Sequence, residues 1–248
     1  MKKYILIFQL IVVYIYLFTH SLIAQWEVLE SSVNNHLNDV CFVDSLYGWA
    51  VGDSGTIIAT TDGGKTWTRH RNPIDTLRFL KVKFVNQLVG FVGGNGIIKD
   101  PYAWIYNPVL LKTIDGGENW TDIDLGLERD HLFENMEFLD SDTGWVVSNN
   151  IGRTNLYDRG GILLKTENGG DDWIILRQTK PYVITSIAFW DNKYGFLVYG
   201  YCIDNFDDSI IAFSEDGGLT WRDVGIIEAE IVKNVSLLSL DTLWAIGF

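Results

Sequence analysis

After residue 25 the chain is dominated by short apolar runs separated by turn-forming residues, and no long helical periodicity is present. Four of these runs read VCFV, VKFV, MEFL and IAFW, and they begin at residues 40, 82, 136 and 187. Each run is followed by a polar turn and then by a glycine joined to an aromatic residue, as in Gly48-Trp49. Runs this short, with turn residues between them, predict β-strands.

An octet with the pattern Ser/Thr-x-Asp/Asn-Gly-Gly-x-x-Trp occurs once after each of these runs. It reads TTDGGKTW at 60–67, TIDGGENW at 113–120, TENGGDDW at 166–173 and SEDGGLTW at 214–221. Its central acidic or amide residue recurs at spacings of 53, 53 and 48 residues. A regular period of this size indicates a repeat architecture.

One repeat unit therefore comprises a strand, a turn, a Gly-aromatic strand, a variable loop, a third strand, the Asp-Gly-Gly turn and a Trp strand. Four antiparallel strands with a period of about 50 residues predict an all-β β-propeller. The chain contains four full blades, and 235–248 match a fifth unit only through its second strand. Residues 26–29 read WEVL and resemble the last strand of a blade whose other strands come from the C-terminal side.

The octet suits a tight hairpin. Glycine accepts positive φ without steric cost, and an Asp side chain can accept hydrogen bonds from the N–H groups of its own turn. Asn168 replaces the acid in the third copy, and an amide keeps the acceptor oxygen but is a poor catalytic carboxylate or charged metal ligand. We therefore expect a structural octet, formed by Thr60, Asp62, Gly64, Trp67, Thr113, Asp115, Gly117, Trp120, Thr166, Asn168, Gly170, Trp173, Ser214, Asp216, Gly218 and Trp221.

The octets resemble the Asp-box, also called the bacterial neuraminidase repeat, which occurs on propeller blades. The fuller unit GWAVGDSGTIIATTDGGKTW at 48–67 resembles the photosystem II assembly and stability factor family of Asp-box propellers. This resemblance covers 26–248 and implies the fold. It implies no single function, because the octet also occurs in sialidases, xyloglucanases, sortilin-type receptors and non-catalytic binding propellers.

Two interpretations of the partial fifth unit remain open. Either the chain is a fragment of a larger ring, or it is a complete five-bladed ring with an incomplete last blade. The resemblance to a family of seven-bladed rings favours the fragment.

The N-terminus has the pattern of a secretory signal peptide. Lys2 and Lys3 precede an apolar run, and small Ala24 offers a cleavage site. We expect a signal peptide at 1–24 and the propeller at 25–248, which predicts a secreted or periplasmic protein. The alternative is an uncleaved membrane anchor, because the apolar run is long.

The chain is acidic, with a formal net charge of −13. Removal of 1–24, which carry two lysines, would leave a net charge of about −15. Such a surface repels nucleic acid and favours neutral or cationic partners, so we expect a protein or carbohydrate partner and no cofactor. The assembly factor family is thought to engage its partner through a basic patch, which this acidic chain does not display.

The cysteines and acidic turns indicate no metal site. Cys41 and Cys202 fall in different units, and we interpret them as small core residues rather than as a pair joined by ring closure. The stretch DSDTG at 140–144 resembles a calcium loop, but it aligns with an ordinary turn in the other units. We therefore expect no bound metal.

The longest insertions share one topological position, the loop between the second and third strands. Because this loop lies on the face opposite the octets, where Asp-box enzymes have their active sites, three successive insertions should cluster there. In the second blade the loop expands to about 95–108, in the third to about 149–160, and in the fourth it follows Gly200. The candidate binding residues are Tyr102, Trp104, Tyr106, Arg153, Tyr157, Asp158, Arg159, Tyr201, Asp204, Phe206, Asp207 and Asp208.

Aromatic side chains beside carboxylates suit carbohydrate or peptide ligands, but the same aromatics could simply pack the loops together. We predict a non-catalytic binding or scaffold module, without assigned catalytic residues. The alternative is a glycoside hydrolase, sialidase- or xyloglucanase-like, that uses loop carboxylates. The many acidic loop residues make such a pair unspecific, and no nucleophile–histidine motif accompanies them.

Overall fold

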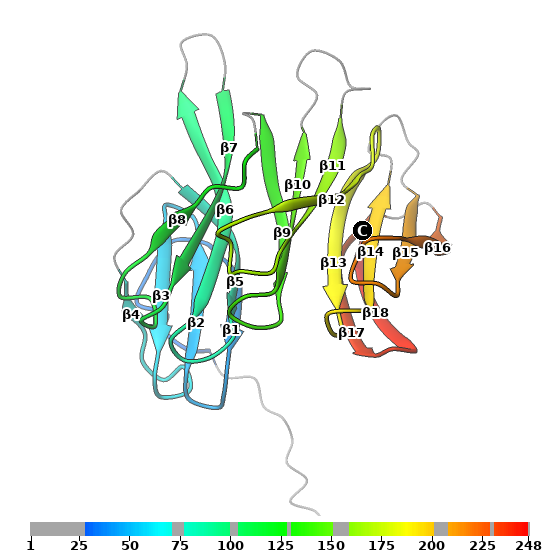
Figure 1. The fold of residues 1–248 in the computed structure, drawn as a ribbon. Coiled ribbons are helices and arrows are strands. Elements are labelled where there is room, and N and C mark those ends of the chain that lie inside the picture. Colours follow the sequence, from blue (N-terminus) through cyan, green and yellow to red (C-terminus); the bar gives the residue numbers. More distant parts are fainter. Residues whose placement is uncertain are drawn as a thin grey trace, which may run out of the picture. The chain divides into compact units, whose positions relative to one another are not determined.

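The computed structural model describes residues 28–70, 77–99, 104–127, 130–150, 159–200, 208–228 and 231–247. Within these ranges the chain forms eighteen strands in five antiparallel sheets, and it contains no helix (Figure 1). Residues 31–248 form one compact unit, which holds all five sheets. The all-β fold of repeated four-stranded blades is therefore confirmed.

Each full blade is a meander whose strands pair in chain order. The first blade comprises β1 (Leu37–Phe42), β2 (Gly48–Gly52), β3 (Thr56–Thr60) and β4 (Thr68–Arg69). The second comprises β5 (Leu77–Phe84), β6 (Gly90–Lys99), β7 (Trp104–Thr113) and β8 (Thr121–Ile123). The third comprises β9 (His131–Phe138), β10 (Gly144–Asn150), β11 (Gly160–Thr166) and β12 (Ile174–Gln178).

The fourth blade comprises β13 (Val183–Phe189), β14 (Gly195–Gly200), β15 (Ser209–Ser214) and β16 (Arg222–Ile227). The fifth sheet has the two strands that the sequence predicts, β17 (Val232–Ser239) and β18 (Thr242–Gly247). Val28 and Leu29, the described half of the WEVL segment, are not part of a strand.

The octet turn has the geometry that its residue types predict. Gly63 and Gly64 have φ values of 75° and 88°, which a side chain would strain. The Asp62 Oδ1 atom accepts hydrogen bonds from the Thr66 amide at 2.9 Å and from the Thr60 hydroxyl at 2.8 Å. The Thr60 Oγ1 atom in turn accepts the Gly64 N–H at 2.9 Å. The Asp side chain is thus a turn clasp, as in an Asx-turn.

Asn168 forms the same turn as the aspartates of the other octets, but the direction of one side-chain hydrogen bond is reversed. Its Oδ1 atom accepts the Asp172 amide at 2.9 Å, in the same way as the Asp62 carboxylate accepts the Thr66 amide. In the other octets the second carboxylate oxygen accepts a side-chain donor, for example the Thr66 hydroxyl at 2.6 Å. In the third octet the Asn168 amide instead donates to the Asp172 carboxylate at 3.0 Å. The amide at position 168 is therefore matched by an acid at position 172.

The octets and the first turns of the blades lie on the same face, as the topology predicts. The Gly63 amide donates to the Leu46 carbonyl at 2.9 Å, which joins the first octet to the turn between β1 and β2. Asp44 closes that turn by accepting the amides of Leu46 and Tyr47. Asp140, the first residue of the calcium-like stretch, accepts two turn amides in the same manner. The acidic residue of this turn therefore has a backbone-clasping role.

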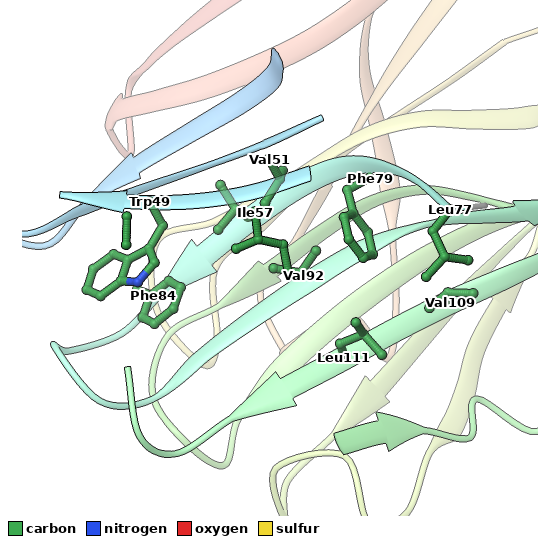
Figure 2. Close-up of a cluster of buried hydrophobic side chains, with 11 residues drawn as sticks. Trp49, Val51, Ile57, Leu77, Phe79, Phe84, Val92, Val109 and Leu111 are labelled. Carbon is green, nitrogen blue, oxygen red and sulfur yellow. The ribbon is translucent and has the colours of Figure 1, made fainter. Parts of the chain in front are cut away.

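Neighbouring blades are joined by a flat stack of two aromatic rings. Trp49 of β2 lies on Phe84 of β5, with ring centroids 3.6 Å apart and planes within 5° (Figure 2). Phe84 also meets Trp120 of its own octet edge to face, at 6.1 Å between centroids. The octet Trp is thus one wall of the interface between blades, and the stacked rings add about 0.5–1.5 kcal/mol beyond the area that they bury.

The same stack recurs at the next two interfaces. Phe91 lies on Phe138 at 3.6 Å, and Trp145 lies on Phe189 at 3.7 Å between centroids. Glycine begins each second strand because the ring covers it: a Cβ atom on Gly144 would lie 2.2 Å from the ring of Phe138. The recurring Gly-aromatic dipeptide therefore encodes the packing between blades.

The first strand of each sheet, which we call the inner strand, has a β-bulge of one residue at the same place in its pairing with the second strand. The strand pairing skips Asn38 in β1, Leu80 in β5, Glu134 in β9, Thr185 in β13 and Lys233 in β17. A bulge leaves the extra residue outside the ladder and turns its side chain away from the regular alternation. The five bulge residues therefore share one position of the repeat, which is polar in every sheet except the second, where Leu80 packs on the core.

Exchanging the third octet's amide for the usual acid should destabilise the protein. In Asn168→Asp, two carboxylates would meet where the Asn168 amide now donates to Asp172, which should cost about 0.5–1 kcal/mol. The double variant Asn168→Asp/Asp172→Thr reproduces the first octet's pairing and should recover the loss. Urea unfolding measures both values. Equal stability of the single variant and the parent would contradict this account of the pairing.

Acid should weaken the octets of the first and second blades. Hydrogen bonds from Thr66 and Asn119, respectively, hold the pKa of Asp62 and of Asp115 at about 2. A depressed folded-state pKa contributes stability above the ordinary value of 3.8, and this is lost as the pH falls through about 2. Between pH 4 and pH 2.5 the parent should lose more unfolding free energy than Asp62→Asn/Asp115→Asn, measured by urea titration. Glu118→Gln, in the second octet turn, is the matched control, and equal losses in parent and double variant would refute the prediction.

Candidate binding face

The loops between second and third strands lie at the opposite end of each blade from the octets. In the first blade this loop is the tight turn Asp53-Ser54-Gly55, as expected, with Ser54 and Gly55 at φ values of 55° and 62°. In the second blade the prediction of a long loop over 95–108 is wrong. There β6 and β7 continue as a paired hairpin, from Asn95 opposite Pro108 to Lys99 opposite Trp104.

The physical reason for this extension lies in the residues themselves. The segment IIK at 97–99 and the segment WIY at 104–106 are rich in β-branched and aromatic residues, which favour paired strands. Trp104 and Tyr106 therefore belong to a strand and not to a loop. Only 100–103 remain between the two strands.

Three of the candidate binding residues have described side chains. Tyr106 lies on β7 and its carbonyl accepts the Asp130 amide at 3.1 Å. Arg159 directly precedes β11, and Asp208 directly precedes β15, where it is exposed. Trp104 has a described backbone only. The remaining candidates lie outside the described residues: Tyr102, Arg153, Tyr157, Asp158, Tyr201, Asp204, Phe206 and Asp207.

A pocket of about 270 Å³ opens among the inner strands of the third, fourth and fifth sheets. Three bulge residues line it, namely Glu134, Thr185 and Lys233. Arg159, from the predicted set, also lines it, and the other lining residues are Leu132, Asn149, Asn150 and Val183. The pocket thus joins one predicted residue to polar side chains that were not among the sequence-based candidates.

Glu134 is the acidic member of the pocket. Burial raises the pKa of its carboxyl, while the charges of Lys233 and Lys81 and a hydrogen bond from Asn149 oppose that rise. The Asn149 amide lies 3.5 Å from the carboxylate. Two cationic side chains, Lys233 and Arg159, line the same pocket. The pocket therefore presents both signs of charge.

Asn149 also joins the third blade to the fourth. Its amide donates to the Ile184 carbonyl at 2.8 Å, and its Oδ1 atom accepts the Ile184 N–H at 3.0 Å. Asn95 makes the same pair of bonds to Phe133 between the second and third blades. The wall of the pocket is therefore held by hydrogen bonds between blades, which makes it a rigid feature.

A sequence signal for these residues does exist. Glu134, Thr185 and Lys233 are polar residues at one register position of the repeat, in the first strands of the third, fourth and fifth sheets. Polar residues at intended core positions are unfavourable unless they serve a function or find partners. An alignment of the units by their inner strands would have identified them.

Two further predictions concern residues away from the pocket. The Cys41 thiol packs between the first two blades, where its Sγ atom lies 3.4 Å from the Phe84 amide nitrogen, and burial raises its pKa. Cys202 and 1–27 lie outside the described residues. Within the described ranges, no three His, Cys, Asp or Glu side chains gather as a metal site would require, and no apolar helix of membrane-spanning length is present.

A family model described as "Photosynthesis system II assembly factor YCF48" matches residues 19–128. Among curated proteins, the "Photosystem II assembly lipoprotein Ycf48" of Synechococcus sp. (strain CC9902) is 24% identical over 153 residues. That match covers 60% of this chain and 39% of the relative, so the chain spans well under half the length of this curated protein.

Solved structures show the same fold. "YCF48 from Cyanidioschyzon merolae" has a TM-score of 0.62 and 20% identity, over 90% of this chain and 67% of that one. "YCF48 bound to D1 peptide" has a TM-score of 0.53 and 17% identity, over 90% and 92% of the two chains.

A glycoside hydrolase propeller is also similar in fold. The GH93 α-L-arabinofuranosidase of Fusarium graminearum has a TM-score of 0.52 and 12% identity, over 80% of this chain and 70% of that one. An identity this low shows a common fold and says nothing about activity. Together with the octets and the blade packing, the comparisons confirm the resemblance drawn from the sequence: the chain is an Asp-box β-propeller similar to the photosystem II assembly factor family.

Proposed function

We propose that this protein is a non-catalytic binding or assembly module that engages a segment of a protein partner on the face opposite the octets. The observation that carries the proposal is the pocket between the third, fourth and fifth sheets, where Glu134, Arg159 and Lys233 meet around about 270 Å³. A pocket with both charges, amide groups and an apolar wall suits a peptide, whose backbone and side chains offer both donors and acceptors.

The hydrogen bonds between blades at the pocket wall support a preformed binding site. Asn149 fixes the positions of two adjacent blades, and the octets clamp the opposite ends of the same strands. A preformed rigid site loses little conformational entropy when a ligand binds. The variable loops of the same face, which hold most of the predicted aromatic and acidic residues, would then add specificity around this anchor.

The similar proteins also support a peptide-binding role. The similar proteins are described as assembly factors, and one of the similar solved structures is of YCF48 bound to a D1 peptide. By analogy, a peptide segment of a larger protein is the class of ligand that we assign to this chain. The acidic surface favours a segment with cationic or neutral residues around the anchor.

The glycoside hydrolase alternative requires two carboxyl groups flanking one bond. Among the described residues, Glu134 is the only carboxylate that lines the pocket. Within the described part of the chain the pocket therefore supplies a single candidate acid, and we favour binding. A carbohydrate ligand would be detected by the test given below.

We further propose a secreted or periplasmic location, with 1–24 as the signal peptide. The Lys-Lys start and the apolar run that follows it support this assignment. The Synechococcus relative is described as a lipoprotein, which agrees with export of that protein.

The binding proposal can be tested with two probes, a random 12-residue peptide display library and a glycan array. We expect enrichment of peptides and no glycan signal. For an enriched peptide, Lys233→Ala and Glu134→Gln should each weaken binding about tenfold, because each removes a charge that the ligand would meet in the pocket.

The matched control is Lys193→Ala, which removes a lysine from the turn on the octet face and should leave affinity unchanged. Hydrolysis of glycans by the purified protein would refute the non-catalytic proposal. Unchanged affinity in both pocket variants would place the peptide site elsewhere.

The burial of Glu134 also predicts a pH-dependent gain in stability when its charge is removed. Because the folded-state pKa is raised above the ordinary 4.5, ionisation costs more in the folded protein than in the unfolded chain. The cost is absent below the ordinary pKa, and it is complete once the pH exceeds the raised value. Glu134→Gln should therefore gain stability relative to the parent as the pH rises from 4 to 7, measured by urea unfolding. Glu228→Gln, an exposed residue, should show no such trend, and a flat difference for Glu134→Gln would contradict the prediction.

A further inference from the structure

Two large apolar side chains of the second blade are exposed at its octet end. Leu88, in the turn between β5 and β6, is 59% exposed, and Ile114, in the octet, is 71% exposed. The Gly116 amide of this octet donates to the Leu88 carbonyl at 2.9 Å, so the turn and the octet lie side by side. The second blade has a neighbour on each side, because β5 packs against β1 and β7 packs against β9. The exposure of the two residues therefore does not depend on the ends of the chain.

A third apolar side chain extends this surface to the first blade. Leu46 holds the position in the first blade's turn that Leu88 holds in the second, and it is 50% exposed. The Gln87 side-chain amide donates to the Asp44 carboxylate at 2.9 Å, which joins the two turns. Leu46, Leu88 and Ile114 form what we call the apolar patch. Large apolar side chains that gather on an exposed surface indicate an interaction site.

The turns themselves do not require apolar residues at these positions. Where the second blade has Leu88, the third has Asp142 and the fourth has Lys193. The carbonyls of Asp142 and Lys193 each accept the same octet amide at 2.8 Å, so the hydrogen bond forms with a polar residue as well. The other octets have a threonine or a glutamate where the second has Ile114. The apolar patch is therefore a property of the first two blades and not of the fold.

The surroundings of the apolar patch are strongly acidic. The first turns and octets of the four full blades carry twelve acidic residues and two lysines, a net charge of −10, within 44–47, 60–67, 86–89, 113–120, 140–143, 166–173, 191–194 and 214–221. The whole chain has a formal net charge of −13, so these segments hold most of it. Asp44 and Glu118 are exposed in the same turns as the patch residues. Such a rim attracts cationic groups and repels nucleic acid and anionic membrane surfaces.

We propose that the apolar patch docks a second protein segment, one in which large apolar side chains are flanked by lysine or arginine. The apolar side chains of that segment cover Leu88 and Ile114, and its cations meet the carboxylates of Asp44 and Glu118. This surface goes beyond the proposed function, because it lies at the opposite end of the blades from the pocket. With both sites occupied, the chain holds two protein segments at once, one on each face.

A synthetic peptide of about 14 residues, made only of leucine and lysine with the leucines on one face of a helix, tests the proposal. Fluorescence anisotropy measures its affinity for the purified protein at neutral pH. We expect the parent to bind this peptide. A peptide with glutamate in place of lysine, and one with serine in place of leucine, should each bind at least about tenfold more weakly, because each lacks one of the two recognised groups.

Variants of exposed residues assign the binding to the apolar patch. Leu88→Ser/Ile114→Ser should weaken binding about tenfold, because it removes the apolar surface that the leucines cover. Glu118→Lys should also weaken binding, and the loss should shrink at high salt, which screens exposed charges. The matched control is Leu219→Ser, which removes an exposed apolar side chain from the fourth octet and should leave affinity unchanged. Lys233→Ala, in the pocket, should also bind like the parent, so the two proposals are tested separately.

Unfolding in urea at the parent's midpoint establishes that each variant is folded. No binding by the parent, equal affinity of the parent and Leu88→Ser/Ile114→Ser, or equal binding of the leucine–glutamate peptide would overturn the proposal. Vesicles of phosphatidylcholine probe the alternative of a lipid surface, and we expect no co-sedimentation with them. Co-sedimentation that Leu88→Ser/Ile114→Ser abolishes would assign the apolar patch to a membrane and overturn the protein partner.

Discussion

The architecture depends on one contact, the flat stack of a second-strand aromatic on the Phe that ends the next inner strand. This contact recurs between Trp49 and Phe84, between Phe91 and Phe138, and between Trp145 and Phe189. The stack needs a glycine under the Phe, because a Cβ atom there would overlap the ring. It also requires an octet nearby, whose Trp meets the same Phe and whose glycine carbonyl accepts a donor from the preceding blade. The contact thus repeats with the period of the sequence at the first three interfaces, whereas Phe196 of the fourth blade lies against Phe213 of the same blade.

Because these contacts occupy the octet face, the blades differ from one another in sequence mainly on the opposite face. The octet turns are hydrogen-bonded to the first turns of their own blades. The carboxylate oxygens of the octets accept hydrogen bonds from backbone amides and from side-chain donors of the same turn. In the second interface, where Phe91 has no indole N–H, the Lys112 ammonium donates to the Gly169 carbonyl instead. The hydrogen bond to the octet glycine carbonyl is therefore kept even where the aromatic residue is not a tryptophan. The opposite face carries one end of the bulged strands and the pocket, which is where we propose that a partner binds.

The candidate site was only partly predictable. Strand topology placed Arg159 on the face opposite the octets, and there its side chain lines the pocket. Trp104 and Tyr106 were expected in a loop, because the length of the insertion was considered without the strand propensity of its two arms. Glu134 and Lys233 were missed because they lie in strands about 100 residues apart, and each has polar neighbours in its own strand. They become a pair only when the third, fourth and fifth sheets come together.

The blade, its period, the position of each octet and the role of the octet residues could all be read from the residue order, because they depend on contacts within about eight residues. The pairing of Asn168 with Asp172 illustrates such a local contact, because both residues lie in the same turn. Which side chains meet across blades was settled by tertiary packing alone. The ring stack and the bulge residues that line the pocket both depend on how one sheet faces the next. That arrangement follows from long-range packing, which the order of residues in one unit does not reveal.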